Sequence, residues 1–521
     1  MLVDTTSKFN EYVGQIEKDL AHSESSHLVV DVETNGLDAF GRNQLCGVGL
    51  GYKDETYYFP FRHQQGKNLD PTHQRRLMRC LEMTDMLVGY NIKFDLKFLE
   101  KAGYKPPEEV TFADVIVMVR LTEPASVKEL GLTHTIQRIY GEAAASYDKD
   151  TKKELRSNKW HKDFSLSPPE LLGPYCEQDV YWTHKLYVKT LKQIVESNQV
   201  DVMNLEFDLT KVLYSLENEG IAIDTAYVQD AITRIDQRRN EVEAKIYDLA
   251  DKEFNINSSQ QVGELLNERG IRSSIQTPKG KESWSELALV QIDDPLAGYI
   301  RQYRALEKLK STYLEPYLDA PVMHTSYCNW GTLTGRLSSK EPNLQNIPRT
   351  HFKLLDRELT EDERNTVRGR INAIIAAKGT SAVLDLSNHV LDTWGFVGDE
   401  SFDPEDREQV AMRRMFIPRK GYRLVSFDYS QMEVRVFTFG VIYGIGKARL
   451  ANQLNVSEKE AFQYKKKYFA GISGSKSFID KVSRTVSTRG WVKNRYGRKY
   501  VIPEDLAYKG VNYLVQGTSA D

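Results

Sequence analysis

Acidic side chains at short, regular spacings are the first feature of this sequence that could perform chemistry. Asp31 and Glu33 stand two residues apart in VVDVETNGLD, and the alternation of a β-strand would place both carboxylates on one face. The apolar Val29 and Val30 before them indicate a buried strand, where a charge is costly without a partner. Taken alone, such a pair is more often an acidic pair beside a turn.

Two further acidic residues follow at helical spacing. Asn91 and Asp95 are four residues apart in GYNIKFDLKFLE, and Tyr175 and Asp179 repeat that spacing in GPYCEQDVYWTH. Each pair alone is typical of a solvated helix face. Together with the strand pair, however, they supply the carboxylate oxygens that Mg²⁺ and Mn²⁺ prefer. Two such ions, about 3.5–4 Å apart, can activate water and stabilise the leaving oxygen of a phosphodiester.

The ordered motifs D-x-E, N-x-x-x-D and Y-x-x-x-D resemble those of the DEDDy 3′–5′ exonucleases, over roughly residues 25–195. The resemblance implies hydrolysis of the terminal phosphodiester of DNA, with two Mg²⁺ or Mn²⁺ ions in the active site. It also implies four metal ligands in this sequence: Asp31, Glu33, Asp95 and Asp179. Tyr175 would position the attacking water.

Another motif, in the C-terminal half, combines basic and amide side chains. TLTGRLSSKEPNLQNIP, residues 332–348, resembles a signature of the family A DNA polymerases, the bacterial polymerase I type. By this resemblance, Arg336 would reach the minor-groove side of the primer terminus, and Asn343 and Gln345 would lie near the primer–template backbone. Minor-groove acceptors are nearly equivalent among base pairs, so such contacts test pair shape rather than sequence.

A later segment resembles motif A of the same family. It is VSFDYSQMEVRVF, residues 425–437. The resemblance implies that Asp428 binds two catalytic Mg²⁺ or Mn²⁺ ions, helped by the backbone carbonyl of Tyr429. Glu433 would be a catalytic residue that closes over the sugar of the incoming nucleotide and excludes a 2′-hydroxyl, with Gln431 as a further nucleotide contact.

Two more segments resemble family motifs near the nucleotide and the primer–template junction. FGVIYGIG resembles the end of motif B, and it places Phe439 and Tyr443 four residues apart on one helical face toward the nucleotide. VNYLVQGTSAD, residues 511–521, resembles the Q-G-T-x-A-D helix. Its Asn512 and Gln516 would contact the primer–template junction.

Residues 200–322 are mostly helical in pattern and resemble the thumb. EFDLTKVLYSLENEG predicts an amphipathic helix that Gly220 ends, and Asp224 is the expected N-cap of the long helix that follows. The side chains expected to grip duplex phosphates are Asn257, Lys308, Lys310, Ser311 and Thr312. Such contacts position a duplex without reading its sequence, and each lysine taken singly is more often structural.

The elements that must position the acidic motifs are predicted by hydrophobic spacing. HLVVDVET, QLCGVGLGY and TYYFPF predict three strands of a mainly antiparallel sheet between residues 27 and 62. Helical spacing predicts helices over 71–89, 91–103, 125–140 and 165–196, the last with proline near its start. RLVSFDYSQ predicts a strand, and helices are expected from there to the end.

These patterns and resemblances imply an α/β, ribonuclease H-like exonuclease domain followed by an α+β right-hand polymerase domain with palm, fingers and thumb. The expected boundaries are 1–197 for the exonuclease domain, 198–322 for the thumb, 323–437 for the palm with an insertion at about 350–410, 438–510 for incomplete fingers, and 511–521 for the start of a truncated C-terminal palm segment. The insertion is charged and then mixed, and it fits either a surface subdomain or a solvated elaboration.

Composition sets the class of protein. The chain has 521 residues, 40% of them hydrophobic, which is ordinary for a globular protein of about three to five domains or subdomains. It shows no apolar run of about 18 residues, no signal-peptide pattern and only four scattered cysteines, so we expect a cytoplasmic protein of a bacterial or phage-infected cell without a membrane partner. Residues 411–510 carry 21 basic and seven acidic residues, which fits a polyanion-binding face or a solvated lysine surface.

Two departures from the family pattern bear on activity. Motif A runs directly into motif B, where the family has a few dozen residues between them, and the sequence stops at Asp521, before the family's His-Asp-Glu motif. Either the sequence omits parts of the protein or this form cannot polymerise.

The interpretation is a replicative, proofreading DNA polymerase with a compact, phage-like layout. Its partners would be primer–template DNA and deoxynucleoside triphosphates, together with replisome proteins such as a helicase–primase or a processivity factor. One alternative is a 3′–5′ exonuclease whose polymerase half only binds DNA. An alternative of another class is a non-catalytic DNA-binding scaffold.

Overall fold

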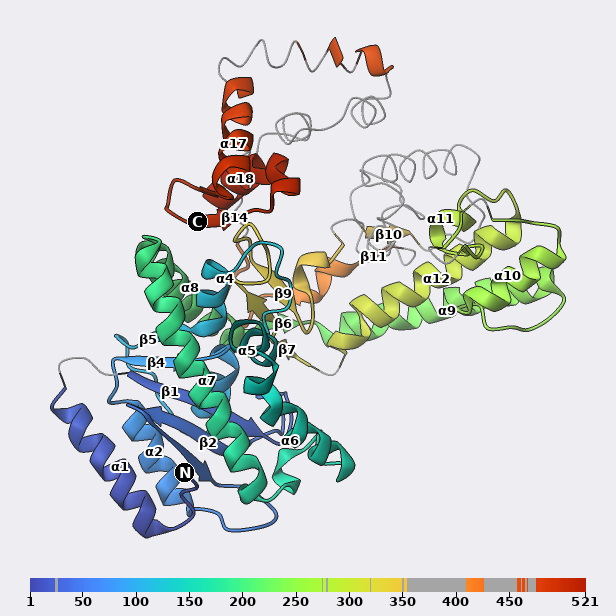
Figure 1. The fold of residues 1–521 in the computed structure, drawn as a ribbon. Coiled ribbons are helices and arrows are strands. Elements are labelled where there is room, and N and C mark those ends of the chain that lie inside the picture. Colours follow the sequence, from blue (N-terminus) through green and yellow to red (C-terminus); the bar gives the residue numbers. More distant parts are fainter. Residues whose placement is uncertain are drawn as a thin grey trace. The chain divides into compact units, whose positions relative to one another are not determined.

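The computed structural model describes residues 1–23, 27–273, 275–277, 280–318, 320–348, 351–353, 409–425, 457–460, 462–463, 466 and 475–521. The chain divides into two compact units (Figure 1). Unit 1 comprises Met1–Glu219, Tyr327–Ser338 and Gly474–Asp521, and unit 2 comprises Gly220–Ser326 and Ser339–Ser473. The domain boundaries expected from the sequence stay predictions.

A five-stranded mixed sheet is the centre of unit 1, in the order β3-β2-β1-β4-β5. Its strands are β1 (His27–Thr34), β2 (Leu45–Tyr52), β3 (Glu55–Pro60), β4 (Met86–Gly89) and β5 (Thr111–Asp114). The first three pair antiparallel, as predicted, whereas β4 and β5 run parallel to β1. The expected helix over 71–89 is therefore wrong in its second half, because the apolar run at 87–89 is buried between β1 and β5.

The two faces of this sheet pack against different helices, and β1 alternates between them. Val30 and Val32 join the core formed with α1 (Thr6–Ala21) and α2 (Pro71–Leu81), whereas Val29 joins the core formed with α4 (Val115–Thr122) and α7 (Pro169–Glu196) (Figure 1). Asp31 and Glu33 follow Val29 by two and four residues in β1, so their side chains point to the same face of the sheet as Val29. Both carboxylates therefore lie on the α7 face.

Glycines in β2 let α7 approach the sheet closely. A Cβ atom added at Gly49 would lie 2.5 Å from Cys176 Sγ and 2.8 Å from Val180 Cγ2, both on α7. A Cβ added at Gly51 would lie 2.8 Å from Val180 Cγ1. These small residues therefore set the distance between β2 and the α7 turn that carries Tyr175 and Asp179.

The other elements of unit 1 are α3 (Lys93–Lys101), α5 (Leu132–Tyr140), α6 (Ser146–Ser157), α8 (Val200–Glu219), α17 (Ser475–Arg489), β13 (Trp491–Lys493), β14 (Lys499–Val501), α18 (Gly510–Ala520) and the 3₁₀ helices η1 (Glu142–Ala145), η2 (Phe164–Leu166) and η9 (Glu504–Lys509). The expectation of helices to the end is wrong at β13 and β14, which pair antiparallel. Their turn forms because the Asn494 side chain accepts the N–H groups of Tyr496 and Arg498, and because Gly497 supplies a φ of 95°.

Helix α8 turns two buried carboxylates toward other segments of unit 1. Glu217 Oε1 accepts the Tyr327 N–H at 2.6 Å, and Glu217 Oε2 pairs with Lys97 Nζ at 2.6 Å. Three turns earlier, Glu206 pairs with Arg498 at 2.5 Å and accepts from Asn329 at 2.7 Å. Buried charges are tolerated where they are paired and hydrogen-bonded. Glu206 and Glu217 therefore connect α8 to segments of unit 1 that are distant in the sequence.

Unit 2 is built on α9 (Thr225–Ala250) and α12 (Pro295–Tyr313), which share one apolar core. Asp224 caps α9 by accepting the Tyr227 N–H at 2.9 Å, and Gly220 ends α8 with a φ of 63°, both as predicted. The smaller elements are α10 (Ser259–Glu268), α11 (Glu286–Leu289), β6 (Ile221–Ile223), β7 (Val322–Met323), β10 (His351–Lys353), β11 (Gln409–Ala411), β12 (Phe416–Ile417), η3 (Glu315–Tyr317), η4 (Leu344–Asn346) and η8 (Met412–Met415).

Short strands in unit 2 join remote segments. β6 lies between β7 and β12, and β10 pairs with β11. The strands β8 (Ser326–Cys328) and β9 (Ser338–Lys340) form a separate two-stranded sheet at the two ends of Tyr327–Ser338, a segment that belongs to unit 1. Of the expected strand RLVSFDYSQ, residues 423–425 are irregular and the rest lies outside the described residues. Among the described helices, none is both long and apolar enough to cross a membrane.

The close approach of β2 and α7 generates a first prediction. Gly49→Ala should lower the free energy of unfolding by about 1–3 kcal/mol, because the new methyl group overlaps Cys176 and Val180. Gly14→Ala is the matched control: its Cβ would meet Arg76 at an ordinary 3.5 Å, so alanine should stabilise α1 by about 0.5–1 kcal/mol. Urea unfolding curves measure both, and an unchanged midpoint for Gly49→Ala would show that α7 packs differently.

Candidate active site

Three elements of unit 1 bring the four predicted carboxylates together. Asp31 and Glu33 come from β1, Asp95 from α3 and Asp179 from α7. The Val32 N–H of β1 donates to Asp95 Oδ1 at 3.0 Å, which ties α3 to the strand. Besides burial, the charges of Asp31, Asp95 and Asp179 all raise the pKa of Glu33, and the Asp31 charge also raises the pKa values of Asp95 and Asp179.

Burial and mutual repulsion make these carboxylates unusually basic. Glu33 and Asp95 are only 5% and 3% exposed. Burial raises the pKa of Asp31 to about 6, and burial together with the Asp31 charge raises the pKa of Asp179 to about 8. Burial and neighbouring carboxylates also hold the pKa values of Glu33 and Asp95 well above their ordinary range. All four can be ionised together at neutral pH only if cations offset their charge.

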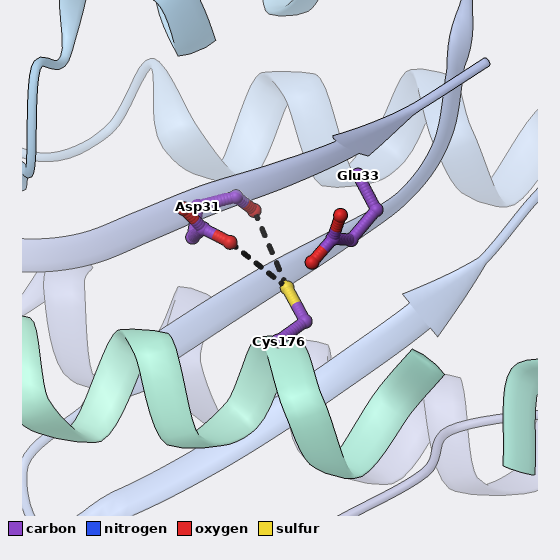
Figure 2. Close-up of side chains that lie close together, drawn as sticks. All are labelled: Asp31, Glu33 and Cys176. Carbon is purple, nitrogen blue, oxygen red and sulfur yellow. Dashed lines mark hydrogen bonds between the residues drawn. The ribbon is translucent and has the colours of Figure 1, made fainter. Parts of the chain in front are cut away.

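A cysteine that the motif analysis passed over also lies at this cluster. Ligand atoms of Asp31, Glu33 and Cys176 all lie within 4.8 Å of one another (Figure 2). The Cys176 thiol donates to Asp31 Oδ2 at 3.3 Å, and burial, followed by the Asp31 charge, raises the thiol pKa. Without a metal ion, Cys176 is therefore a protonated hydrogen-bond donor to Asp31. Cysteine spacing alone gave no signal for it.

Helix α6 supplies further partners that the sequence did not indicate. The Tyr147 hydroxyl donates to Asp179 Oδ1 at 2.6 Å, and the Tyr175 hydroxyl donates to Asp148 Oδ1 at 3.3 Å. Lys152 Nζ pairs with the same Asp148 oxygen at 2.6 Å. Burial and nearby carboxylates raise both tyrosine pKa values, so both hydroxyls keep their protons. The two residues of the Y-x-x-x-D motif are thus each held by a neighbour on α6.

Asn91 has a different role from the helical one expected. It precedes α3 with a φ of 61°, so Asn91 and Asp95 do not share a helix face. Its N–H donates to Asp114 Oδ1 at 2.8 Å, and the same oxygen accepts the Ile116 N–H at the start of α4. Burial raises the pKa of Asp114 to about 6. The turn at Asn91 thus directs the chain into α3, which carries Asp95.

The predicted DNA contacts lie on both units. In unit 2, Lys310 pairs with Asp236 at 2.8 Å, and Lys308 is half-buried, with burial lowering its pKa. Asn343 caps η4 by accepting the Gln345 N–H at 3.0 Å. The exposed members of the set are Asn257, Ser311, Thr312, Arg336, Asn343 and Gln345, and the half-buried ones on α18 are Asn512 and Gln516. Their contacts with DNA stay predictions.

The predicted polymerase residues Asp428, Tyr429, Gln431, Glu433, Phe439 and Tyr443 lie outside the described residues. Their roles likewise stay predictions. The described part of the candidate active site is therefore the carboxylate cluster of unit 1.

Two sequence families match this chain. The profile of DNA polymerase family A matches residues 225–438 and 435–521, and the profile of a 3′–5′ exonuclease matches residues 4–196. The two segments of the polymerase match meet where predicted motif A adjoins motif B. The exonuclease match spans the five strands of the sheet and the carboxylate cluster.

Individual relatives agree with both matches. DNA polymerase I of Pseudomonas aeruginosa is 26% identical, over 96% of this chain and 56% of the relative. DNA polymerase I of Chloroflexus aurantiacus is 30% identical, over 94% of this chain and 53% of the relative. The chain thus spans about half the length of the curated relatives it matches. These relatives are bacterial, and the phage-like layout stays a prediction.

A solved structure shows the same fold. The POL domain of Pol1 from M. smegmatis, in complex with DNA primer–template and dNTP, has a TM-score of 0.63 at 16% identity. The alignment covers 100% of this chain and 86% of that one. The predicted fold class is confirmed by this likeness. Since the polymerase profile matches more than half of the residues, the chain belongs to DNA polymerase family A, with a 3′–5′ exonuclease domain before the polymerase region.

Proposed function

We propose that residues 1–197, within unit 1, are a 3′–5′ exonuclease domain acting on the end of a DNA strand, and that the whole protein is a template-directed DNA polymerase that proofreads with it. The observation that carries the exonuclease proposal is the cluster of four carboxylates with raised pKa values, of which Glu33 and Asp95 are buried and Asp31 and Asp179 half-buried. A fold gains little from crowding four like charges at a partly buried site, so we attribute them to chemistry.

A pair of divalent cations, Mg²⁺ or Mn²⁺, fits this donor set. Asp31, Glu33, Asp95 and Asp179 would hold them, since hard cations prefer carboxylate oxygens and offset buried negative charge. When bound, such ions supply an activated water and stabilise the leaving oxygen of the phosphodiester. A zinc-type centre is a poorer fit, because zinc sites are built mainly from Cys and His, whereas the four proposed ligands are carboxylates.

The protein's own groups orient the reaction. The Tyr175 hydroxyl, held by Asp148, would hydrogen-bond and aim the attacking water. The Tyr147 hydroxyl would fix the rotamer of Asp179, as the Val32 N–H fixes Asp95. Ligand orientation by such outer partners commonly changes metal affinity or rate by about 10–100-fold.

The polymerase proposal rests on the family match. Nucleotide addition would use Asp428, Tyr429, Glu433 and their neighbours, with residues 198–322 as thumb, and attack by the primer 3′-hydroxyl on the nucleotide's α-phosphate. Primer–template DNA and a deoxynucleoside triphosphate would be the substrates, as in the complex of the M. smegmatis relative. An exonuclease whose polymerase half only binds DNA is the second candidate, because motifs A and B adjoin.

Replisome partners and a cytoplasmic location stay predictions.

The carboxylate cluster predicts the outcome of neutralising it. Asp31→Asn with Glu33→Gln should abolish release of nucleotides from a single-stranded 3′ end, because two ligands are removed. In EDTA the same variant should melt at a higher temperature than the wild type, because buried repulsion is relieved. Glu108→Gln with Glu109→Gln, two carboxylates at the surface, is the control and should change neither. Wild-type nuclease activity in the Asp31/Glu33 variant would refute the assignment.

The raised pKa values predict how the metal-free protein depends on pH. A carboxyl whose folded pKa exceeds its unfolded value binds more protons when folded, so stability falls as pH rises between the two values. For Asp31 and Asp179 that window runs from about 4 to the folded values of about 6 and 8. The urea midpoint measured in EDTA should therefore decline between about pH 5 and about pH 8. In excess Mg²⁺ the decline should be smaller, because bound cations offset the carboxylate charge. Parallel profiles with and without Mg²⁺ would contradict the prediction.

The hydroxyl on α6 gives a third test of the site. Tyr147→Phe removes only the hydrogen bond to Asp179, so exonuclease kcat should fall about 10–100-fold and Mn²⁺ affinity should weaken. Calorimetric Mn²⁺ titration reports affinity independently of turnover. Tyr140→Phe removes a hydroxyl bonded to the exposed Lys185 carbonyl and serves as control. If Tyr147→Phe and Tyr140→Phe behave alike, Asp179 is positioned by something else.

A further inference from the structure

Beyond Tyr147, helix α6 continues as a row of basic side chains. Lys149, Lys152, Lys153 and Arg156 line, together with Asp148, a surface hollow of about 390 Å³. All four basic residues are exposed. From Asp148 to Arg156 the helix rises about 12 Å, since each residue adds about 1.5 Å.

One residue that lines this hollow, Asp148, also contacts a residue of the candidate active site. Asp148 is a wall of the hollow and also accepts the Tyr175 hydroxyl at 3.3 Å. Lys152 pairs with Asp148, and its charge opposes the rise in the pKa of Glu33 that burial and the other carboxylates cause. The hollow therefore leads away from the residue proposed to aim the attacking water.

The charges along the row are only partly neutralised. Lys149 pairs with Glu142 at 2.7 Å and Lys152 with Asp148 at 2.6 Å. Lys153 and Arg156 form no ion pair within the part of the chain that the structure describes, and the acidic neighbours on α6 besides Asp148 are Asp150 and Glu154. Two more exposed lysines, Lys159 and Lys162, follow the end of α6 in the sequence.

A polyanion needs such a surface to reach this active site. The strand to be cleaved carries a negative charge on each phosphate, and it must approach four acidic ligands and Asp148. A positive row beginning at the site offsets that repulsion and fixes the strand without reading its bases. An acidic partner protein would also fit the charge, but the hydrogen bond from Tyr175 to Asp148 in the wall of the hollow favours the substrate strand.

We propose that the basic row of α6 binds the phosphates of single-stranded DNA immediately upstream of the bond that is cleaved. The inference rests on the proposed exonuclease function and adds to it the path of the substrate strand. It predicts that short substrates, which carry no phosphates along this path, do not depend on Lys153 and Arg156.

The test compares substrates of two lengths on the full chain with Mn²⁺. For the variant Lys153→Ala with Arg156→Ala, kcat/KM on an octanucleotide should fall about five- to twentyfold, mainly through KM. On a dinucleotide the kcat/KM of the variant should stay within about twofold of the wild-type value. The Mn²⁺ affinity of the variant should be unchanged. The dependence of log KM on log salt should weaken by about 0.7 for each phosphate that the variant no longer neutralises.

The matched control is Arg75→Ala with Arg79→Ala, which removes the same charge from α2, on the opposite face of the sheet. It should keep the wild-type length dependence. If the α6 variant also keeps that dependence, or both variants lose it equally, the strand does not follow α6. If the wild type degrades neither substrate, the proposed exonuclease function itself fails. Binding of an acidic protein rather than DNA to the row would likewise leave the length dependence intact and overturn the inference.

Discussion

Four carboxylates crowded into one partly dehydrated space are the constraint on which unit 1 is built. Burial raises the pKa of each, and their mutual repulsion adds to the cost, so the folded chain must hold them there by packing elsewhere. The glycines of β2 admit α7, the Val32 N–H holds Asp95, and α6 reaches over to Asp179 and Tyr175. Each of these interactions fixes an oxygen in advance, which lowers the reorganisation needed when cations and substrate bind.

The same helix that carries Asp95 is also fastened to a segment far along the chain. Lys93 donates to the Tyr327 carbonyl at 2.7 Å, and Glu217 accepts the Tyr327 N–H at 2.6 Å. Lys93 and Lys97 flank Asp95 in sequence, and all three side chains of the Lys93–Glu217–Lys97 cluster are largely buried. Removing Glu217 would leave two largely buried ammonium groups without this counter-charge. Glu217 therefore helps to hold the segment that leads into the 332–348 motif to α3 within unit 1.

Much of this arrangement could be predicted from sequence, because periodicity reports directly on faces. Spacing of two in β1 and of four in α7 correctly grouped Asp31 with Glu33 and Tyr175 with Asp179. The prediction that Asn91 lies on the same helix face as Asp95 was wrong, because Asn91 has a positive φ and precedes α3. The prediction of a helix at Met86–Gly89 was wrong, because a short apolar run fits the end of a helix as well as a buried strand. Cys176, Tyr147 and Asp148 had no local signal at all: their importance comes from α6 and α7 packing over β1, which only tertiary structure reveals.

The two proposed activities differ in how much of their chemistry the described chain contains. The carboxylates proposed as exonuclease ligands and their hydrogen-bond partners lie within one compact unit, whereas the polymerase match is divided at 435–438, where predicted motif A adjoins predicted motif B. Relatives nevertheless align over 94–97% of the chain, on both sides of that junction. The exonuclease proposal therefore rests on side-chain geometry within unit 1, whereas the polymerase proposal rests on the family match on both sides of the junction. A non-catalytic scaffold is the weaker alternative, because it does not account for like-charged side chains held together at a cost in unit 1.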